Sequence, residues 1–137
     1  MSNMIKLQRY LFILMATSLT LSCSKPVDID GFDETVWKND KMGCASERVE
    51  LLNSLMNERE KIKGLNTSEI VKVLGKPDIH DLSKRNQKYF VYNVTPGPKC
   101  ERYTEGASST TLKVRFNAVG LAYEVLVDKP IASQSAR

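Results

Sequence analysis

This 137-residue sequence offers 16 Asp and Glu side chains for acid–base or metal chemistry, but only one histidine and three cysteines. The single histidine, His80, stands between Asp78 and Asp81, and a metal site or an acid–base pair would need further groups held beside it. This segment directly follows a predicted helix end, so a polar turn over residues 78–81 is the simpler interpretation. We therefore expect no metal site.

Acidic residues also gather near the start of the chain, where Asp28, Asp30 and Asp33 surround Gly31 and resemble part of a calcium loop. The residue that closes a twelve-residue calcium loop would be Asn39, which lacks the bidentate carboxylate needed there. We interpret these carboxylates as a solvated acidic tether. The sequence also lacks a phosphate-binding glycine loop and the spacing of a nucleophile elbow. It therefore predicts a protein that is not an enzyme, with no catalytic residue, no cofactor and no small-molecule substrate.

The beginning of the chain has the pattern of a bacterial lipoprotein signal. The first ten residues carry Lys6 and Arg9 and no acidic residue, the next eleven are almost all apolar, and a serine precedes Cys23. The apolar run is too short for a bilayer core, which takes roughly 20 residues to cross, so a permanent transmembrane helix is disfavoured. We expect residues 1–22 to be removed as a signal peptide and Cys23 to be lipidated. A soluble secreted form and an uncleaved form are the alternatives.

A lipid on Cys23 would anchor the mature protein in a membrane. Ser24, rather than an aspartate, follows Cys23, and by analogy with common bacterial sorting this favours the outer membrane, on its periplasmic face. The expected partners are envelope proteins. Removal of the signal takes Lys6 and Arg9 away, so the formal charge falls from +4 to +2. The sequence pI of about 9.0 is therefore weak evidence for nucleic-acid binding, and we expect no nucleic-acid partner.

The two remaining cysteines, Cys44 and Cys100, are expected to form a disulfide. An exported chain matures in an oxidising compartment, where a leftover pair usually bonds. On the chain-entropy estimate the bridge contributes roughly 4 kcal/mol, in a domain whose total stability is about 5–10 kcal/mol. The alternatives are a reactive thiol and a thiol triad of one cysteine with His80 and Asp81, which the oxidising compartment disfavours.

The mature chain is long enough for one small domain and too short for two. Residues 23–43 show no sustained periodicity and are predicted to be a tether and an extended lead-in. Residues 44–129 are predicted to form the folded domain, and residues 130–137 to form a flexible tail.

Two helices are predicted at the start of the domain. Between Cys44 and Gly64 apolar residues recur at three- and four-residue steps, which indicates one amphipathic helix. Its apolar positions include Val49, Leu52, Leu55, Met56 and Ile62. A second, shorter helix should begin after Asn66, with Glu69 as its capping-box partner, and end at Gly75.

Three antiparallel strands are predicted to follow, over residues 87–94, 112–116 and 121–127, because β-forming residues recur there at period two. Residues 117–120 should close a hairpin between the second and third strands. In the third strand, Leu121, Tyr123, Val125 and Val127 are expected to share one face. The helix residues Leu52, Leu55, Ile70, Val73 and Leu74 are expected to pack on Leu112, Val114 and Phe116.

Two parts of the chain are candidates for partner contact. Trp37 lies outside every predicted element, so it either fastens the lead-in onto the core or anchors a partner. The long segment over residues 95–109 carries Arg102 and Tyr103 beside Cys100, and both are of types that dominate binding hot spots. An ordinary surface loop is the alternative for this segment.

The order of these elements resembles the SmpA/OmlA (BamE-like) small outer-membrane lipoproteins, over about residues 60–127 together with the lipoprotein signal. The segments that carry the resemblance are residues 64–78, which end in Leu74-Gly75-Lys76-Pro77, residues 89–92, and residues 112–120 with Phe116 and Gly120. The resemblance implies an α+β fold with a two-helix layer on a three-stranded antiparallel sheet. It also implies a periplasmic scaffold role without catalytic residues.

Together these patterns favour a non-enzymatic, lipid-anchored periplasmic domain that binds protein in outer-membrane assembly or envelope maintenance. An inhibitor or immunity-like protein that acts on an envelope enzyme is the alternative. An inhibitor should insert a loop such as residues 96–106 into its target, whereas an assembly factor should use a broad sheet or helix face. A hydrolase or metal enzyme is a third class, which a metal assay and an activity screen would test.

Overall fold

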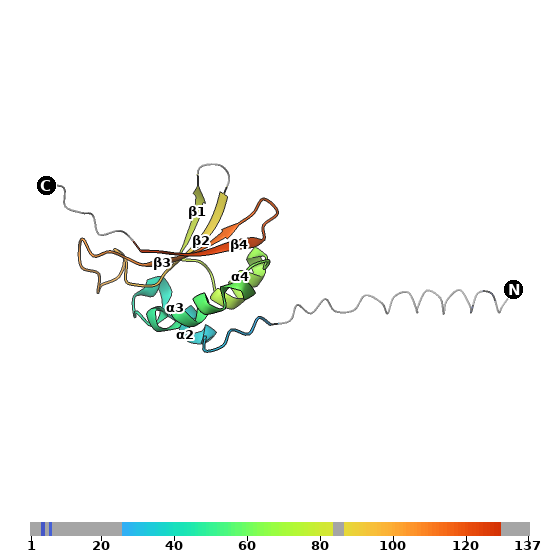
Figure 1. Cartoon of the computed structure of the whole chain (residues 1–137), viewed down its shortest axis with the longest axis horizontal. Helices are drawn as coiled ribbons and strands as arrows, with labels where there is room; N and C mark the ends of the chain where they lie inside the picture. The colour runs from blue at the N-terminus through green and yellow to red at the C-terminus, as the bar shows by residue number, and fades with distance from the viewer. Residues whose placement is uncertain (1–3, 5, 7–25, 84–86, 130–137) are drawn as a thin grey trace.

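The structure, a computed structural model, describes residues 4, 6, 26–83 and 87–129. Helices cover one face of a four-stranded antiparallel sheet of order β1-β2-β3-β4 (Figure 1). The helical elements are α2 (Glu34–Asn39), η1 (Lys41–Gly43), α3 (Arg48–Asn57), η2 (Arg59–Lys61) and α4 (Thr67–Leu74). The strands are β1 (Ile79–Ser83), β2 (Gln87–Asn93), β3 (Thr111–Phe116) and β4 (Ala122–Asp128). The predicted signal peptide over residues 1–22, the lipidation site Cys23 and the tail over residues 130–137 lie outside the described residues.

The predicted α+β class is confirmed, but the described residues contain one more strand and one more α-helix than the sequence indicated. The added strand is β1, which pairs antiparallel with β2 so that Ile79 faces Val91 and Asp81 faces Tyr89. The expectation of a polar turn over residues 78–81 is therefore wrong. A short polar strand at the edge of a sheet carries little period-two signal, because its neighbour and not its own sequence supplies the pairing.

Helix α4 has the predicted boundaries. The side-chain oxygen of Asn66 accepts hydrogen bonds from the backbone N–H groups of Ser68 at 2.9 Å and Glu69 at 3.0 Å. The Glu69 carboxylate accepts from the Asn66 N–H at 2.8 Å, which completes the capping box. At the other end Gly75 has a φ of +75°, a conformation that favours glycine and ends the helix.

The first predicted helix is shorter than expected and is divided. Ser46 has a φ of +66°, so the chain after Cys44 first forms a turn, and α3 begins only at Arg48. At Glu58 the α-helix gives way to the 3₁₀ turn η2. Val49, in the first turn of α3, was expected on the buried side but is 43% exposed.

The lead-in is not extended as expected, since residues 34–39 form helix α2. Asp33 caps this helix by accepting hydrogen bonds from the N–H groups of Thr35 and Val36 at 2.8 and 3.0 Å. One face of α2 places Trp37 in the hydrophobic core. A six-residue helix is too short for a periodic pattern to be read from sequence.

Strands β3 and β4 form the predicted hairpin, with Gly120 at a φ of +82° in the turn. The pairing shifts by one residue between Arg115 and Phe116, which face Glu124 and Ala122 respectively. This β-bulge puts Ala122 and Val125 on the core side and leaves Tyr123 39% exposed. The expectation that residues 121, 123, 125 and 127 share one face is therefore wrong at the start of the strand.

The core lies between the helices and the inner face of the sheet. Its predicted members are confirmed as buried, except Leu52, which is partly buried against the same cluster. The fully or almost fully buried members are Leu55, Ile70, Val73, Leu74, Leu112, Val114 and Phe116. Residues that the prediction did not include also join this cluster, among them Trp37 and Ile62.

Candidate protein-binding surface

The residues around the only histidine do not form a site. The ring of His80 packs edge-on against Phe90, with centroids 5.0 Å apart, whereas Asp81 lines a hollow on the opposite face of the sheet. Asp78 turns to the interior and pairs with Arg48. Across the described parts of the chain, no three His, Cys, Asp or Glu side chains are close enough together to hold a metal ion.

The acidic lead-in residues have local structural contacts. Asp33 caps α2, the backbone N–H of Asp30 donates to the Glu58 carboxylate at 3.1 Å, and the carbonyl of Asp28 accepts from Lys61 at 2.8 Å. The hydrogen bond from Lys61 holds the pKa of the Glu58 carboxyl below its usual value. These contacts fasten the lead-in to the turn η2.

Cys44 and Cys100 are bonded to each other, with their Cα atoms 5.4 Å apart. Neither sulfur is a thiol in this structure, so it contains no thiol triad with His80 and Asp81. The bridge joins the turn before α3 to the segment after β2, which lie far apart in sequence. This is the bond expected between these two residues.

Beside the disulfide lies a buried polar junction that the sequence did not indicate. The guanidinium of Arg48, which is 1% exposed, donates to the carbonyls of Trp37 at 3.0 Å and Asn93 at 2.8 Å. It also lies over the ring of Trp37, 5.1 Å from the centroid, and pairs with Asp78. An arginine at the start of a helix normally points to solvent. The one sequence signal that could have distinguished Arg48 is its position just after the turn at Cys44.

This junction also decides the role of Trp37. The side chain has no exposed surface, and its ring packs against Phe32 and Tyr92 with centroids 5.4 and 6.3 Å away. The proposal that Trp37 anchors a partner is therefore wrong for this structure. The alternative, that it fastens the lead-in onto the core, agrees with its position.

The segment over residues 95–109 projects from the end of β2, on the left in Figure 1. It is organised by local turns, in which the N–H of Cys100 donates to Gly97 and that of Tyr103 donates to Cys100. Arg102 is exposed, while Tyr103 is half-buried and its hydroxyl donates to the Ala107 carbonyl at 3.3 Å. The two predicted contact residues are thus both accessible in part and lie beside the disulfide.

The outer face of the sheet is not covered by any described helix, since all three lie on the other side (Figure 1). Cross-strand pairing places its side chains in rows. One row contains Ile79, Val91, Lys113 and Leu126, and the next contains Asp81, Tyr89, Arg115 and Glu124. We call these residues together with Tyr123 and Asp128 the open sheet face.

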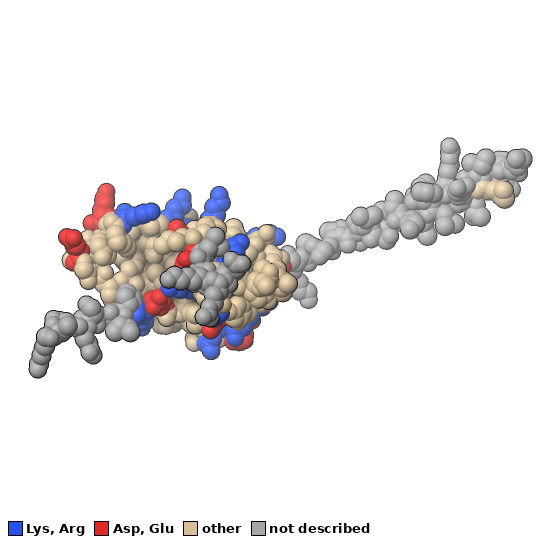
Figure 2. Space-filling view, turned by 90° about the horizontal axis from the view of Figure 1, so that it is seen from above, with Lys and Arg blue, Asp and Glu red and all other residues tan. Residues whose placement is uncertain are grey.

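Apolar and charged side chains alternate over this face. Ile79, Tyr123 and Leu126 are 48%, 39% and 40% exposed, which is high for large apolar residues. Two ion pairs lie among them, from Lys113 to Asp128 at 2.7 Å and from Arg115 to Glu124 at 2.9 Å. Figure 2, which views the molecule from above in the view of Figure 1, shows blue and red side chains scattered among tan ones where grey atoms do not cover the surface.

Arg115 lies among aromatic and acidic side chains of the open sheet face. Its guanidinium lies between two aromatic rings, 4.8 Å from the centroid of Tyr123 and 5.9 Å from that of Tyr89. The hydrogen bond to Glu124 raises the pKa of Arg115, which keeps it charged. These contacts place two tyrosines and one arginine side by side, and both residue types are frequent in binding hot spots.

Comparison of the chain with protein-family models, curated proteins and solved structures found no match. The resemblance to the SmpA/OmlA lipoproteins is therefore a hypothesis that rests on the sequence motifs alone. In the described residues, no helix has both the length and the apolar character that crossing a bilayer requires. What the geometry defines is a class: a small disulfide-bonded α+β domain with one helix-covered and one open sheet face.

Proposed function

We propose that the chain is a non-enzymatic, lipid-anchored periplasmic domain that binds another envelope protein through its open sheet face. The observation that carries this proposal is the group of exposed apolar side chains, Ile79, Tyr123 and Leu126, on a face without a helix. The lipoprotein pattern that ends at Cys23 supports the anchor. The resemblance to the SmpA/OmlA family supports a role in outer-membrane assembly or envelope maintenance.

The chemistry of the open sheet face favours a protein as the partner. Its lysine and arginine are already paired with Asp128 and Glu124, so the face offers no basic field for a polyanion. Tyrosine side chains such as Tyr89 and Tyr123 supply large contact area at a small cost in side-chain entropy. A partner with an apolar centre and a rim of hydrogen-bonding groups matches this arrangement.

The second candidate function is an inhibitor or immunity-like protein that acts on an envelope enzyme. The observation that favours it is the disulfide at Cys100, which fixes the segment over residues 95–109 at one point. A loop that is ordered in advance loses less conformational entropy when it enters a target. Arg102 and Tyr103 would then be the contact residues.

Site-specific photo-crosslinking in intact cells tests both candidates. A benzophenone amino acid is placed at Tyr123 or Leu126 on the open sheet face, at Arg102 in the loop, and at the exposed Asn53 on α3 as a control. We expect one defined adduct, identified by mass spectrometry, from both sheet positions and none from Asn53. Adducts from Arg102 alone would favour the inhibitor, and equal labelling at all positions would contradict a specific surface.

Matched double variants then measure the contribution of each surface once a partner is known. We expect Tyr123→Ala with Leu126→Ala to weaken binding by more than about tenfold, or about 1.4 kcal/mol. The matched pair Arg102→Ala with Tyr103→Ala should change binding less. A larger loss of binding for Arg102→Ala with Tyr103→Ala would show that the segment over residues 95–109, and not the open sheet face, is the binding surface.

Fractionation tests the anchor separately. We expect Cys23→Ser to release the protein from membranes and to change signal cleavage. Equal recovery of the wild type and the variant in the membrane fraction would contradict lipidation at Cys23, whatever the outcome of the crosslinking.

A further inference from the structure

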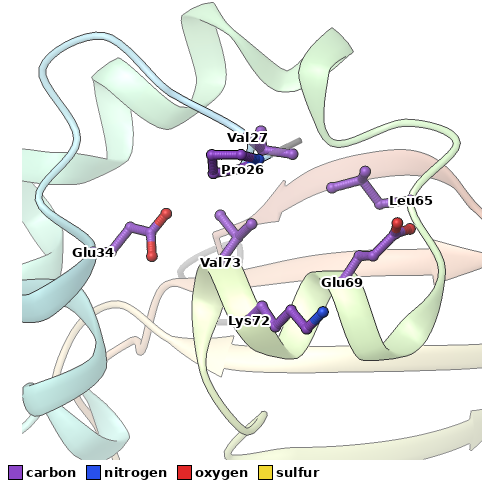
Figure 3. A pocket seen from close by; sticks show the side chains of 7 residues that line it. All are labelled: Pro26, Val27, Glu34, Leu65, Glu69, Lys72 and Val73. Carbon is purple, nitrogen blue, oxygen red and sulfur yellow. The ribbon is translucent and has the colours of Figure 1, made fainter. Parts of the chain in front are cut away.

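Pro26 lies three residues after the predicted lipidation site Cys23. Pro26 and Val27 lie over α4 and line a pocket of about 210 Å³ together with Leu65 and Val73 (Figure 3). Val27 packs against the core, and Ile29 is 5% exposed. Val27 and Ile29 therefore hold this segment of the chain against the domain.

The distance from a lipid on Cys23 to the domain is consequently short. Only Ser24 and Lys25 separate Cys23 from Pro26. Three residue steps span at most about 10 Å when fully extended. A domain anchored in this way is confined against the bilayer, with the end that carries Pro26 nearest to it.

The same end of the domain carries exposed apolar side chains. Val119, in the turn between β3 and β4, is 78% exposed, and Leu121 is 37% exposed. Among the large apolar residues of known exposure in the domain, Val119 has the highest exposed fraction. An apolar side chain in this position at a hairpin turn is costly in water and suits the boundary between headgroups and acyl chains.

Backbone pairing fixes the position of this turn relative to the entry of the chain. The N–H of Ala122 donates to the Leu65 carbonyl at 2.8 Å, and Asn66 forms an isolated bridge with Leu121. Leu65 in turn lines the pocket with Pro26. Figure 1 shows the start of the described domain and the β3–β4 turn at the same end of the molecule, on the right.

We propose that this end of the domain, formed by Pro26, Leu65, Val119 and Leu121, is a bilayer-contact surface whose partner is the headgroup region of the membrane. The inference rests on the proposed lipid anchor at Cys23. The side chains of Val119 and Leu121 enter the interface, and the exposed Lys72 on the rim of the same pocket keeps its ammonium group among the headgroups.

This orientation leaves the partner surfaces accessible. The six residues of β3 separate the turn at Val119 from the segment over residues 95–109, a distance of roughly 20 Å along the strand. The loop with Arg102 therefore points away from the membrane. The open sheet face extends between the two ends and remains exposed to the periplasm.

The test uses the full-length lipidated protein in phosphatidylcholine vesicles, with a polarity-sensitive dye on a single introduced cysteine. The dye is placed at Val119→Cys or, at the opposite end, at the exposed Ser108→Cys. We expect the dye at 119 to be quenched by doxyl lipids at least about twofold more than the dye at 108. Zwitterionic vesicles remove net charge as an explanation for the contact.

A second label at Ala118→Cys guards against an effect of replacing Val119 itself, and thermal unfolding confirms that each labelled protein is folded. Protein that floats with the vesicles but shows equal quenching at 108, 118 and 119 would overturn the bilayer-contact surface and leave the anchor intact. Protein that does not float would overturn the anchor, and this inference with it.

Discussion

The Nη1 atom of Arg48 lies 2.6 Å from Oδ2 of Asp78, and the two side chains are 2% and 7% exposed. Asp78 accepts two further hydrogen bonds, from the backbone N–H groups of Met42 at 3.1 Å and Asn93 at 2.8 Å. The pair thus joins four segments of the chain: η1, the start of α3, the residue before β1 and the end of β2. Removing one member leaves the other buried without its partner.

We expect Arg48→Met to lower the free energy of unfolding by about 3–5 kcal/mol, because the substitution strands the Asp78 carboxylate in the interior. Urea unfolding measures this loss, with the exposed Arg102→Met as a control that should change stability by less than about 0.5 kcal/mol. Combining Arg48→Met with Asp78→Asn should cost less than the sum of the single changes. Additive losses would mean that the two groups do not stabilise the fold as a pair.

The second expectation concerns Phe116, which is 2% exposed and packs edge-on against Phe90 with centroids 4.7 Å apart. Phe116→Ala should lower the free energy of unfolding by roughly 3–5 kcal/mol, since it leaves a cavity in the core. Val119→Ala, in the exposed turn a few residues later, serves as the control and should have almost no effect. An unchanged melting temperature for Phe116→Ala would contradict the assignment of the buried face.

The disulfide gives a third expectation. Non-reducing peptide mapping of the native protein should recover a single linked peptide that contains Cys44 and Cys100. Replacing both cysteines with serine should lower stability by about 4 kcal/mol, because the bridge closes a loop with a sequence separation of 56 residues. Two free thiols in the purified native protein would refute the bond.

The fourth expectation is a dependence on alkaline pH that comes from Tyr92. Its phenol is fully buried, and burial raises the pKa of Tyr92 well above its ordinary value, an effect that the nearby Arg48 only partly offsets. Below about pH 10 both states keep the proton, and the contribution to stability is complete. Above that pH the unfolded chain loses the proton and the folded protein keeps it, so stability falls as pH rises.

For a single group of this kind the loss is roughly 1 kcal/mol between about pH 10 and pH 11. Urea unfolding at these two pH values should show a smaller fall for Tyr92→Phe than for the wild type. At neutral pH the same variant should lose about 1 kcal/mol, because the hydroxyl no longer donates to the Gly75 carbonyl at 3.0 Å. Tyr123→Phe is the matched control on the exposed side, and an equal pH response in both variants would contradict the assignment to Tyr92.

How much of the fold could be predicted depends on where each element obtains its stability. Helix α4 was predictable because Asn66, Glu69 and Gly75 act on their own neighbours in the chain. Helix α2 and strand β1 were missed because they depend on distant residues: Trp37 packs against Tyr92, and Ile79 pairs with Val91. A local sequence pattern gives no information about partners that are distant in the chain.

The candidate surface shows the same division. Arg102 and Tyr103 were suggested by residue type and by their position beside Cys100, and both signals are local. The position of Tyr123 on the open sheet face depends on the β-bulge between Arg115 and Phe116, which shifts the pairing by one residue. A bulge is set by how two strands pair, so strict alternation along β4 placed Tyr123 with Val125 on one face.

The bond between Cys44 and Cys100 also sets how the domain responds to force. Tension applied between the two ends of the chain first loads the contacts of residues 26–43 and then reaches Cys44. From there the force crosses the covalent bridge to Cys100, so α3, α4, β1 and β2 lie outside the loaded path. While the disulfide is intact, about 200 Å of contour length cannot be extended by the force, counted over a sequence separation of 56 residues. In a single-molecule pulling experiment, a reducing agent should therefore lengthen the fully extended chain by about that amount.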